Sequence, residues 1–165
     1  IKPINEGSSV SVYICKKNNF LSNLKKLRHY DEILIEKFIP GREIQVAILG
    51  NEKLGVIELK PKRMFYDYEA KYNPSAKTEH IIPVNISKKN YDEVTSIALK
   101  AHKLLKCRGV TRSDFRFHGN KFYLLETNTQ PGMTALSLVP EIAKYRNISF
   151  AQLIDKILLD ASINK

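Results

Sequence analysis

Three oxygen-bearing side chains lie close together in a segment that is predicted to form a β-hairpin. Asp114 comes before the turn, and Glu126 and Asn128 come after it. Glu126 and Asn128 are two residues apart, so in a strand they share one face of the sheet. Carboxylate and amide oxygens suit Mg²⁺, with phosphate oxygens filling other positions. The spacing predicts a divalent-cation site, and the alternative is a solvated hairpin whose acids merely face water.

The turn of this hairpin decides whether Asp114 joins the other two ligands. A three-residue loop at Gly119–Lys121 sets Asp114 opposite Glu126. A two-residue turn at Gly119–Asn120 sets it opposite Leu125 instead, on the wrong face. The metal hypothesis therefore requires the longer loop, which tolerates Gly or Asn at a left-handed position.

Periodicity in the sequence predicts the elements that must position these side chains. Apolar runs and alternation predict strands at 10–15 and 33–35 and hairpins at 44–58 and 110–128. Helical spacing predicts helices near 18–29 and 88–106 and a last helix that opens with a capping box at Ser149–Gln152. The mixed order predicts an α+β fold with a largely antiparallel sheet flanked by helices.

The strand that carries Glu126 follows the apolar run Phe122–Leu125 and is predicted to be central, where an acid needs a partner. A second notable segment, about 61–82, has little periodicity and contains Pro61 and Pro74. Long loops of this kind are functional lids or are disordered. Its aromatic residues favour an ordered lid, because disordered segments are poor in aromatics.

Composition excludes several classes of function. The 165 residues carry a net charge of +10, but the lysines are scattered and no nucleic-acid signature is present, so a small polyanion such as ATP is the better partner. No apolar run is long enough to span a membrane. Cys15 and Cys107 have no metal spacing and are expected to be free thiols. Neither a P-loop nor a Rossmann glycine motif occurs.

Motifs along nearly the whole chain resemble D-alanine–D-alanine ligase. In family order they are Lys2–Pro3, Glu6–Val10, Ile35–Phe38, Phe65–Tyr72, Arg112–Asp114, Leu125–Thr129, Pro131–Thr134 and Ser137–Pro140. The resemblance implies the C-terminal portion of an ATP-grasp fold. Residues 1–37 would be a remnant of the central lobe, and residues 38–165 the C-terminal lobe with its lid. The N-terminal domain is expected to be absent.

The resemblance also implies roles in binding ATP. Lys2 would bind the α- and β-phosphates, and Lys71 would meet the γ-phosphate from the lid. The adenine and ribose contacts would come from Glu36, Lys37, Phe38, Ile39, Glu43, Phe65 and Leu125, with Glu43 on the ribose. Asp114, Glu126 and Asn128 would hold two Mg²⁺ or Mn²⁺ ions.

The implied reaction joins two D-alanine molecules through an acyl phosphate, for peptidoglycan precursors in the bacterial cytoplasm. Arg112 and the Gly132 amide would stabilise the oxyanion. Ser8 and Tyr72 would hydrogen-bond near the first D-alanine, and Ser137 and Leu138 would hold the second. These groups align substrates and neutralise charge, which is most of what phosphoryl transfer requires.

Two departures from the family pattern stand out. Ser11 replaces a residue that is usually Gly, so the loop is strained if it needs a positive φ. The expected missing N-terminal half supplies groups for the first D-alanine, so the chain alone is not expected to ligate. The sequence does not decide whether the protein forms a homodimer. The alternatives are a D-alanine–D-lactate or D-alanine–D-serine ligase, which Tyr72 disfavours, another ATP-grasp enzyme, or an inactive truncated remnant.

Overall fold

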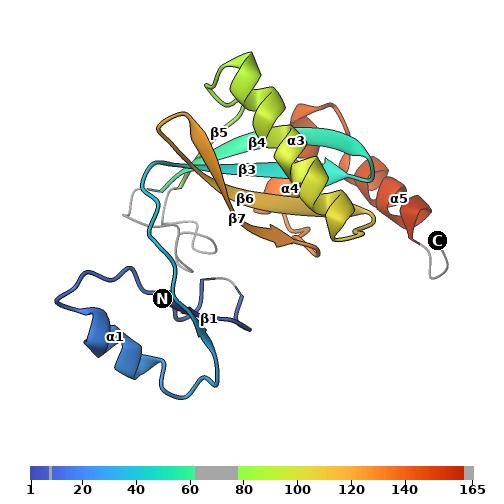
Figure 1. Ribbon diagram of the computed structural model, residues 1–165. Coiled ribbons are helices and arrows are strands. Elements are labelled where there is room, and N and C mark those ends of the chain that lie inside the picture. Colours follow the sequence, from blue (N-terminus) through green and yellow to red (C-terminus); the bar gives the residue numbers. More distant parts are fainter. Residues whose placement is uncertain (8, 62–77, 162–165) are drawn as a thin grey trace. The chain divides into compact units, whose positions relative to one another are not determined.

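The chain divides into two compact units. The computed structural model describes residues 1–7, 9–61 and 78–161 (Figure 1). One unit comprises Ile1–Ile39 and Pro61–Glu79, and the other comprises Pro40–Lys60 and His80–Lys165. The predicted lid falls largely in 62–77, outside the described residues. No helix of the described ranges is long and apolar enough to cross a membrane.

The first unit contains a two-stranded antiparallel sheet and one helix. Strand β1 (Lys2–Pro3) pairs with β2 (Ile33–Leu34), and helix α1 spans Phe20–Lys26, as predicted. The strand predicted at 10–15 was wrong. The chain turns there with positive φ at Ser9 and Ser11, which an extended strand cannot accommodate.

The second unit is built on a five-stranded sheet with the order β5-β4-β3-β6-β7. Its strands are β3 (Arg42–Leu49), β4 (Glu52–Lys60), β5 (Glu79–Ile81), β6 (Val110–His118) and β7 (Lys121–Asn128). Strand β3 pairs antiparallel with β4 and with β6, and β6 pairs antiparallel with β7. Both predicted hairpins and the predicted α+β class are therefore confirmed.

Helices cover the two faces of this sheet (Figure 1). Helix α3 (Lys88–Leu104) lies on one face, where its Val94 and Ala98 join the core cluster that includes Ile44 and Val46 of β3. Helices α4 (Leu138–Tyr145) and α5 (Phe150–Asp160) lie on the other face. Helix α5 begins with the predicted capping box.

Helix α4 was not predicted from the sequence. It has only 8 residues, too few for a clear periodic signal, and it contains Pro140. Proline is tolerated there because it lies in the first turn, where the backbone N–H has no partner within the helix. The helix packs closely on β4 because Gly55 leaves room: a Cβ at Gly55 would lie 2.6 Å from Cγ2 of Ile142.

The prediction that the strand carrying Glu126 is central was wrong. Strand β7 lies at the edge of the sheet that the described residues form, and Glu126 is exposed. The apolar run before it is also partly exposed, with Tyr123 at 36% and Leu124 and Leu125 at 43% each. The apolar run therefore belongs to an edge strand whose side chains are partly exposed to solvent. Because Glu126 is exposed as well, its carboxylate needs no buried partner.

Candidate nucleotide and cation site

The hairpin that carries the predicted cation ligands has the shorter turn. His118 pairs with Lys121, so Gly119 and Asn120 alone form the loop, with φ of 57° and 59°. Positive φ at both central residues is what a type I′ turn requires. The predicted three-residue loop was therefore wrong, and a regular ladder from this turn would place Asp114 opposite Leu125.

A β-bulge restores the pairing that the metal hypothesis needs. Phe115 pairs with Leu124, but the next residue, Asp114, pairs with Glu126, so Leu125 is the extra residue. Beyond the bulge Arg112 pairs with Asn128. Directly opposed residues point to the same face of an antiparallel sheet. Asp114, Glu126 and Asn128 therefore share one face, although the turn differs from the prediction.

Arg112 balances the charge of Asp114 on this face. Its Nε donates to Oδ1 of Asp114 at 2.7 Å and its Nη2 donates to Oδ2 at 3.0 Å, in a two-pronged ion pair. The Asp114 residue is only 8% exposed, and a buried carboxylate requires such compensation. Each carboxylate oxygen has a second lone pair, so Asp114 can accept these bonds and still face a cation.

The donor set fits Mg²⁺ bound together with phosphate. Two carboxylates and one amide oxygen are hard donors, and Oδ1 of Asn128 already accepts a hydrogen bond from Gln130 N at 3.0 Å, which fixes its direction. No group of three or more His, Cys, Asp or Glu side chains that could hold a metal occurs among the described residues. That is expected for Mg²⁺, which is usually bound through one or two carboxylates plus substrate phosphates.

Other predicted site residues lie on nearby strands and loops of the same unit. Glu43, the predicted ribose contact, pairs across the strands with Arg116, whose Nη1 donates to Oε1 at 2.6 Å. Leu125, predicted at the adenine, is the bulged residue and is partly exposed. A ribose contact by Glu43 would therefore have to share its carboxylate with Arg116.

The loop before α4 brings Gly132 next to Ser137. A Cβ at Gly132 would lie 2.8 Å from Oγ of Ser137. The same oxygen accepts a hydrogen bond from Thr134 N at 2.9 Å, so Ser137 holds the loop rather than capping the helix with its side chain. The Leu138 side chain is buried, so substrate contact there would involve its backbone.

The first unit carries the remaining predicted nucleotide contacts. Lys2 Nζ lies 2.9 Å from Oε1 of Glu36, so the predicted phosphate and adenine residues form an ion pair. Lys37 and Phe38 are exposed and Ile39 is half-buried, in the segment after β2. Ser8, Phe65, Lys71 and Tyr72 lie outside the described residues, so their predicted roles stay predictions.

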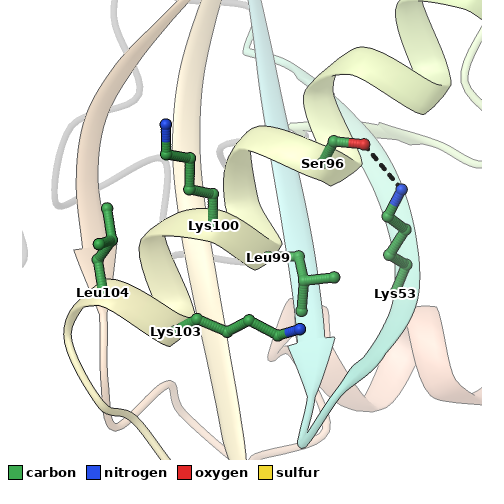
Figure 2. A pocket seen from close by; sticks show the side chains of 6 residues that line it. All are labelled: Lys53, Ser96, Leu99, Lys100, Lys103 and Leu104. Carbon is green, nitrogen blue, oxygen red and sulfur yellow. Dashed lines mark hydrogen bonds between the residues drawn. The ribbon is translucent and has the colours of Figure 1, made fainter.

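A separate cavity of about 400 Å³ lies between α3 and β4 (Figure 2). Its lining includes Lys53, whose Nζ donates to Oγ of Ser96 at 2.9 Å, together with Lys100 and Lys103. None of the predicted site residues lines it. Sequence reasoning did not single out these lysines, although the helical spacing of Ser96, Lys100 and Lys103 would have placed them together.

The antiparallel sheet with helices on both faces is that of the ATP-grasp fold. The chain belongs to the family described as D-ala D-ala ligase C-terminus, which matches residues 1–159.

Relatives and solved structures agree with this membership. All 165 residues of this chain align with a D-alanine–D-alanine ligase of Pelagibacter ubique at 69% identity, and they correspond to 54% of that relative. The chain is 46% identical to the enzyme of Geotalea uraniireducens, covering 99% of this chain and 53% of that one. The match to a ligase structure from Bacillus anthracis covers 96% of this chain and 52% of that chain, with a TM-score of 0.82 and 33% sequence identity. The chain thus spans about half the length of these relatives.

A second Bacillus anthracis structure is of the ligase complexed with ATP. The match covers 88% of this chain and 46% of that chain, with a TM-score of 0.75 and 27% sequence identity. The bound ATP is an observation about the Bacillus anthracis ligase. The similarity supports a search for an ATP site in the present chain.

Proposed function

We propose that this chain supplies the nucleotide and cation site of an enzyme that uses ATP to join two D-alanine molecules. The observation that carries the proposal is the pairing of Asp114 with Glu126 at the bulge, which puts both carboxylates on one face of the sheet. Family membership favours the dipeptide reaction over the D-lactate and D-serine alternatives.

The chain's own residues would bind and orient the reactants. Asp114, Glu126 and Asn128 would hold Mg²⁺ or Mn²⁺, which when bound neutralises phosphate charge. Arg112 lies beside Asp114 and carries the positive charge that an oxyanion formed during attack on the acyl phosphate requires. Gly132 and Ser137, adjacent in the loop before α4, would face the second D-alanine.

Calorimetric titration of the chain with ATP, with and without Mg²⁺, tests the nucleotide site. We expect binding that depends on Mg²⁺ and is weakened at least tenfold by Asp114→Asn. Asp155→Asn removes an exposed carboxylate from α5 and serves as the matched control, with unchanged binding. If the wild-type chain binds ATP equally well with and without Mg²⁺, the proposal is contradicted and an inactive remnant is favoured.

Product analysis tests the substrate. Because the chain spans about half of its relatives, the assay uses it fused behind the N-terminal half of the Pelagibacter ubique enzyme. The fusion is given ATP, D-alanine, and an equal concentration of D-lactate or D-serine, and the products are identified by mass spectrometry. D-alanyl-D-alanine as the main product supports the proposal, whereas a mainly mixed product would assign one of the alternatives.

A further inference from the structure

Gln45 occupies the position next to the predicted cation ligands. It lies in β3 directly opposite Asp114 of β6, which in turn lies opposite Glu126 of β7. The Cβ atoms of directly opposed residues are about 4.5–5.5 Å apart and point to the same face. Gln45, Asp114 and Glu126 therefore form one row across three strands, on the face that carries the ligands.

The amide oxygen of Gln45 is buried without a hydrogen bond. The residue is 3% exposed, and among the described parts of the chain its Oε1 has no partner. Nearly all buried polar atoms in folded proteins have one, so this atom requires an explanation. Its neighbours Ile44 and Val46 point into the core beneath α3, so Gln45 points to the opposite face, toward Asp114.

The row itself offers no donor for this oxygen. The carboxylates of Asp114 and Glu126 offer only acceptor oxygens. On its other side Gln45 is opposite Ile57, which is apolar. Nε and Nη2 of the nearby Arg112 point to Asp114. A donor brought by a ligand would complete the site.

The chemistry of the proposed ligands identifies that donor. Phosphate oxygens of ionised ATP accept hydrogen bonds and cannot supply the missing proton. Mg²⁺ gives up water reluctantly and usually keeps several water molecules when bound to protein. Such a water is a donor located where the carboxylates hold the cation, within the row that contains Gln45.

We propose that Gln45 is a further residue of this site, and that its amide oxygen accepts a hydrogen bond from a water molecule bound to the cation. Gln45 is then a positioning residue: it orients the hydrated cation against Asp114 and Glu126 and does not touch the reacting atoms. The inference rests on the proposed function, because it needs a cation on this face. It names a residue that the sequence motifs did not include.

The test compares Gln45→Met with the wild-type chain. Methionine has a similar volume but only a weak acceptor, so it removes the unmet oxygen. The metal-free variant is expected to melt at a higher temperature than the wild type. Its affinity for Mn²⁺ in the presence of ATP, measured by electron paramagnetic resonance titration, is expected to fall about 10- to 100-fold, as for other residues that support metal ligands.

Two further variants separate a role at the cation from a role in packing. Gln45→Glu keeps the acceptor, so we expect Mn²⁺ affinity at least equal to the wild type. The same variant should melt at a lower temperature without metal, because it places a carboxylate beside Asp114. Ser113→Ala is the matched control: Ser113 is buried in β6 and bonds Thr127 at 3.0 Å. It should lower the melting temperature and leave Mn²⁺ affinity unchanged.

The possible results are distinguishable. If the wild-type chain binds Mn²⁺ with ATP and Gln45→Met binds it equally well, the role of Gln45 is overturned and the proposed function stands. A lower melting temperature for metal-free Gln45→Met would also overturn it, since the oxygen would then have a partner in the fold. If the wild-type chain shows no Mn²⁺ binding, the proposed function and this inference both fail.

Discussion

Single residues in this chain carry backbone strain that the sequence alone only suggests. Ser11 has φ of 57°, in the left-handed region that glycine adopts without cost. A side chain in this conformation costs roughly 1–2 kcal/mol. Its Oγ lies 3.3 Å from the hydroxyl of Tyr30, a long hydrogen bond that returns part of that cost. Ser11 is therefore expected to carry strain that a change in stability can measure.

We expect Ser11→Gly to change stability between zero and about 1 kcal/mol in the stabilising direction, because relief of strain outweighs the lost bond. Ser11→Ala keeps the strain and loses the bond, and should destabilise by about 0.5–1.5 kcal/mol. Urea denaturation followed by circular dichroism measures both. A glycine variant that is less stable than the alanine variant would contradict the strain argument.

His102 is expected to make the free energy of unfolding depend on pH. It is buried, its Nδ1 lies 2.8 Å from Oγ1 of Thr111, and burial lowers its pKa below the ordinary 6.5, against a smaller opposing effect of Asp160. The unfolded chain therefore takes up a proton near pH 6.5, where the folded chain does not. The contribution of neutral His102 to the free energy of unfolding is fully present above that pH. It declines as the pH falls below 6.5, by at most about 1.4 kcal/mol per pH unit.

The measurement is the free energy of unfolding in urea between pH 7.5 and 5. We expect His102→Asn, whose amide lies close to the position of Nδ1 and can bond Thr111, to reduce the loss of stability on acidification. The control is His118→Asn, which replaces an exposed histidine at the end of β6 and should keep the wild-type slope. Parallel curves for the wild type and the His102 variant would show that His102 is not the group responsible.

At the scale of elements, contact between β4 and α4 depends on the missing side chain of Gly55. A Cβ there would lie 2.6 Å from Cγ2 of Ile142, closer than real contacts allow. We expect Gly55→Ala to destabilise by about 1–3 kcal/mol through overpacking. Ile142→Leu removes Cγ2, so the double variant should recover part of this loss. A double-mutant cycle in urea tests it, and additive effects would exclude the contact.

The hairpin β6–β7 shows which parts of the fold the sequence could predict. Gly119–Asn120 is a recognised two-residue turn signal, and the structure uses it as such. The bulge at Leu125 has no signal of its own, because an apolar residue fits a regular strand equally well. The predicted ligand residues were chosen by type and spacing, and their role stays a prediction. The pairing of Asp114 with Glu126 was predicted for the wrong reason, because a bulge and not a longer turn produces it.

Other elements depended on contacts that periodicity does not encode. Residues 10–15 have the alternation of a strand, but left-handed backbone at Ser9 and Ser11 turns the chain there. Tyr13 forms two backbone bonds of 2.9 Å with Ile1. Gln45 was overlooked because it lies inside an apolar run. Its proposed role depends on the pairing of β3 with β6, which puts Gln45 opposite Asp114. Pairing across strands is the information that a single sequence lacks.

For the whole molecule, the net charge of +10 bears on how an anion is captured. The charge is spread along the chain, so its effect on ATP acts at long range rather than through one patch. The screening length falls from about 30 Å at 0.01 M salt to about 8 Å at 0.15 M. Raising the salt should therefore slow encounter with ATP more than it speeds dissociation.

We expect the association rate constant of a fluorescent ATP analogue, with Mg²⁺ present, to fall about tenfold over this range of salt, while the dissociation rate constant changes less. Stopped-flow fluorescence measures both constants. An uncharged adenosine with the same fluorophore is the control and should associate at a rate that salt barely changes. If both ligands show the same dependence on salt, long-range attraction by the positive chain is not what governs capture of ATP.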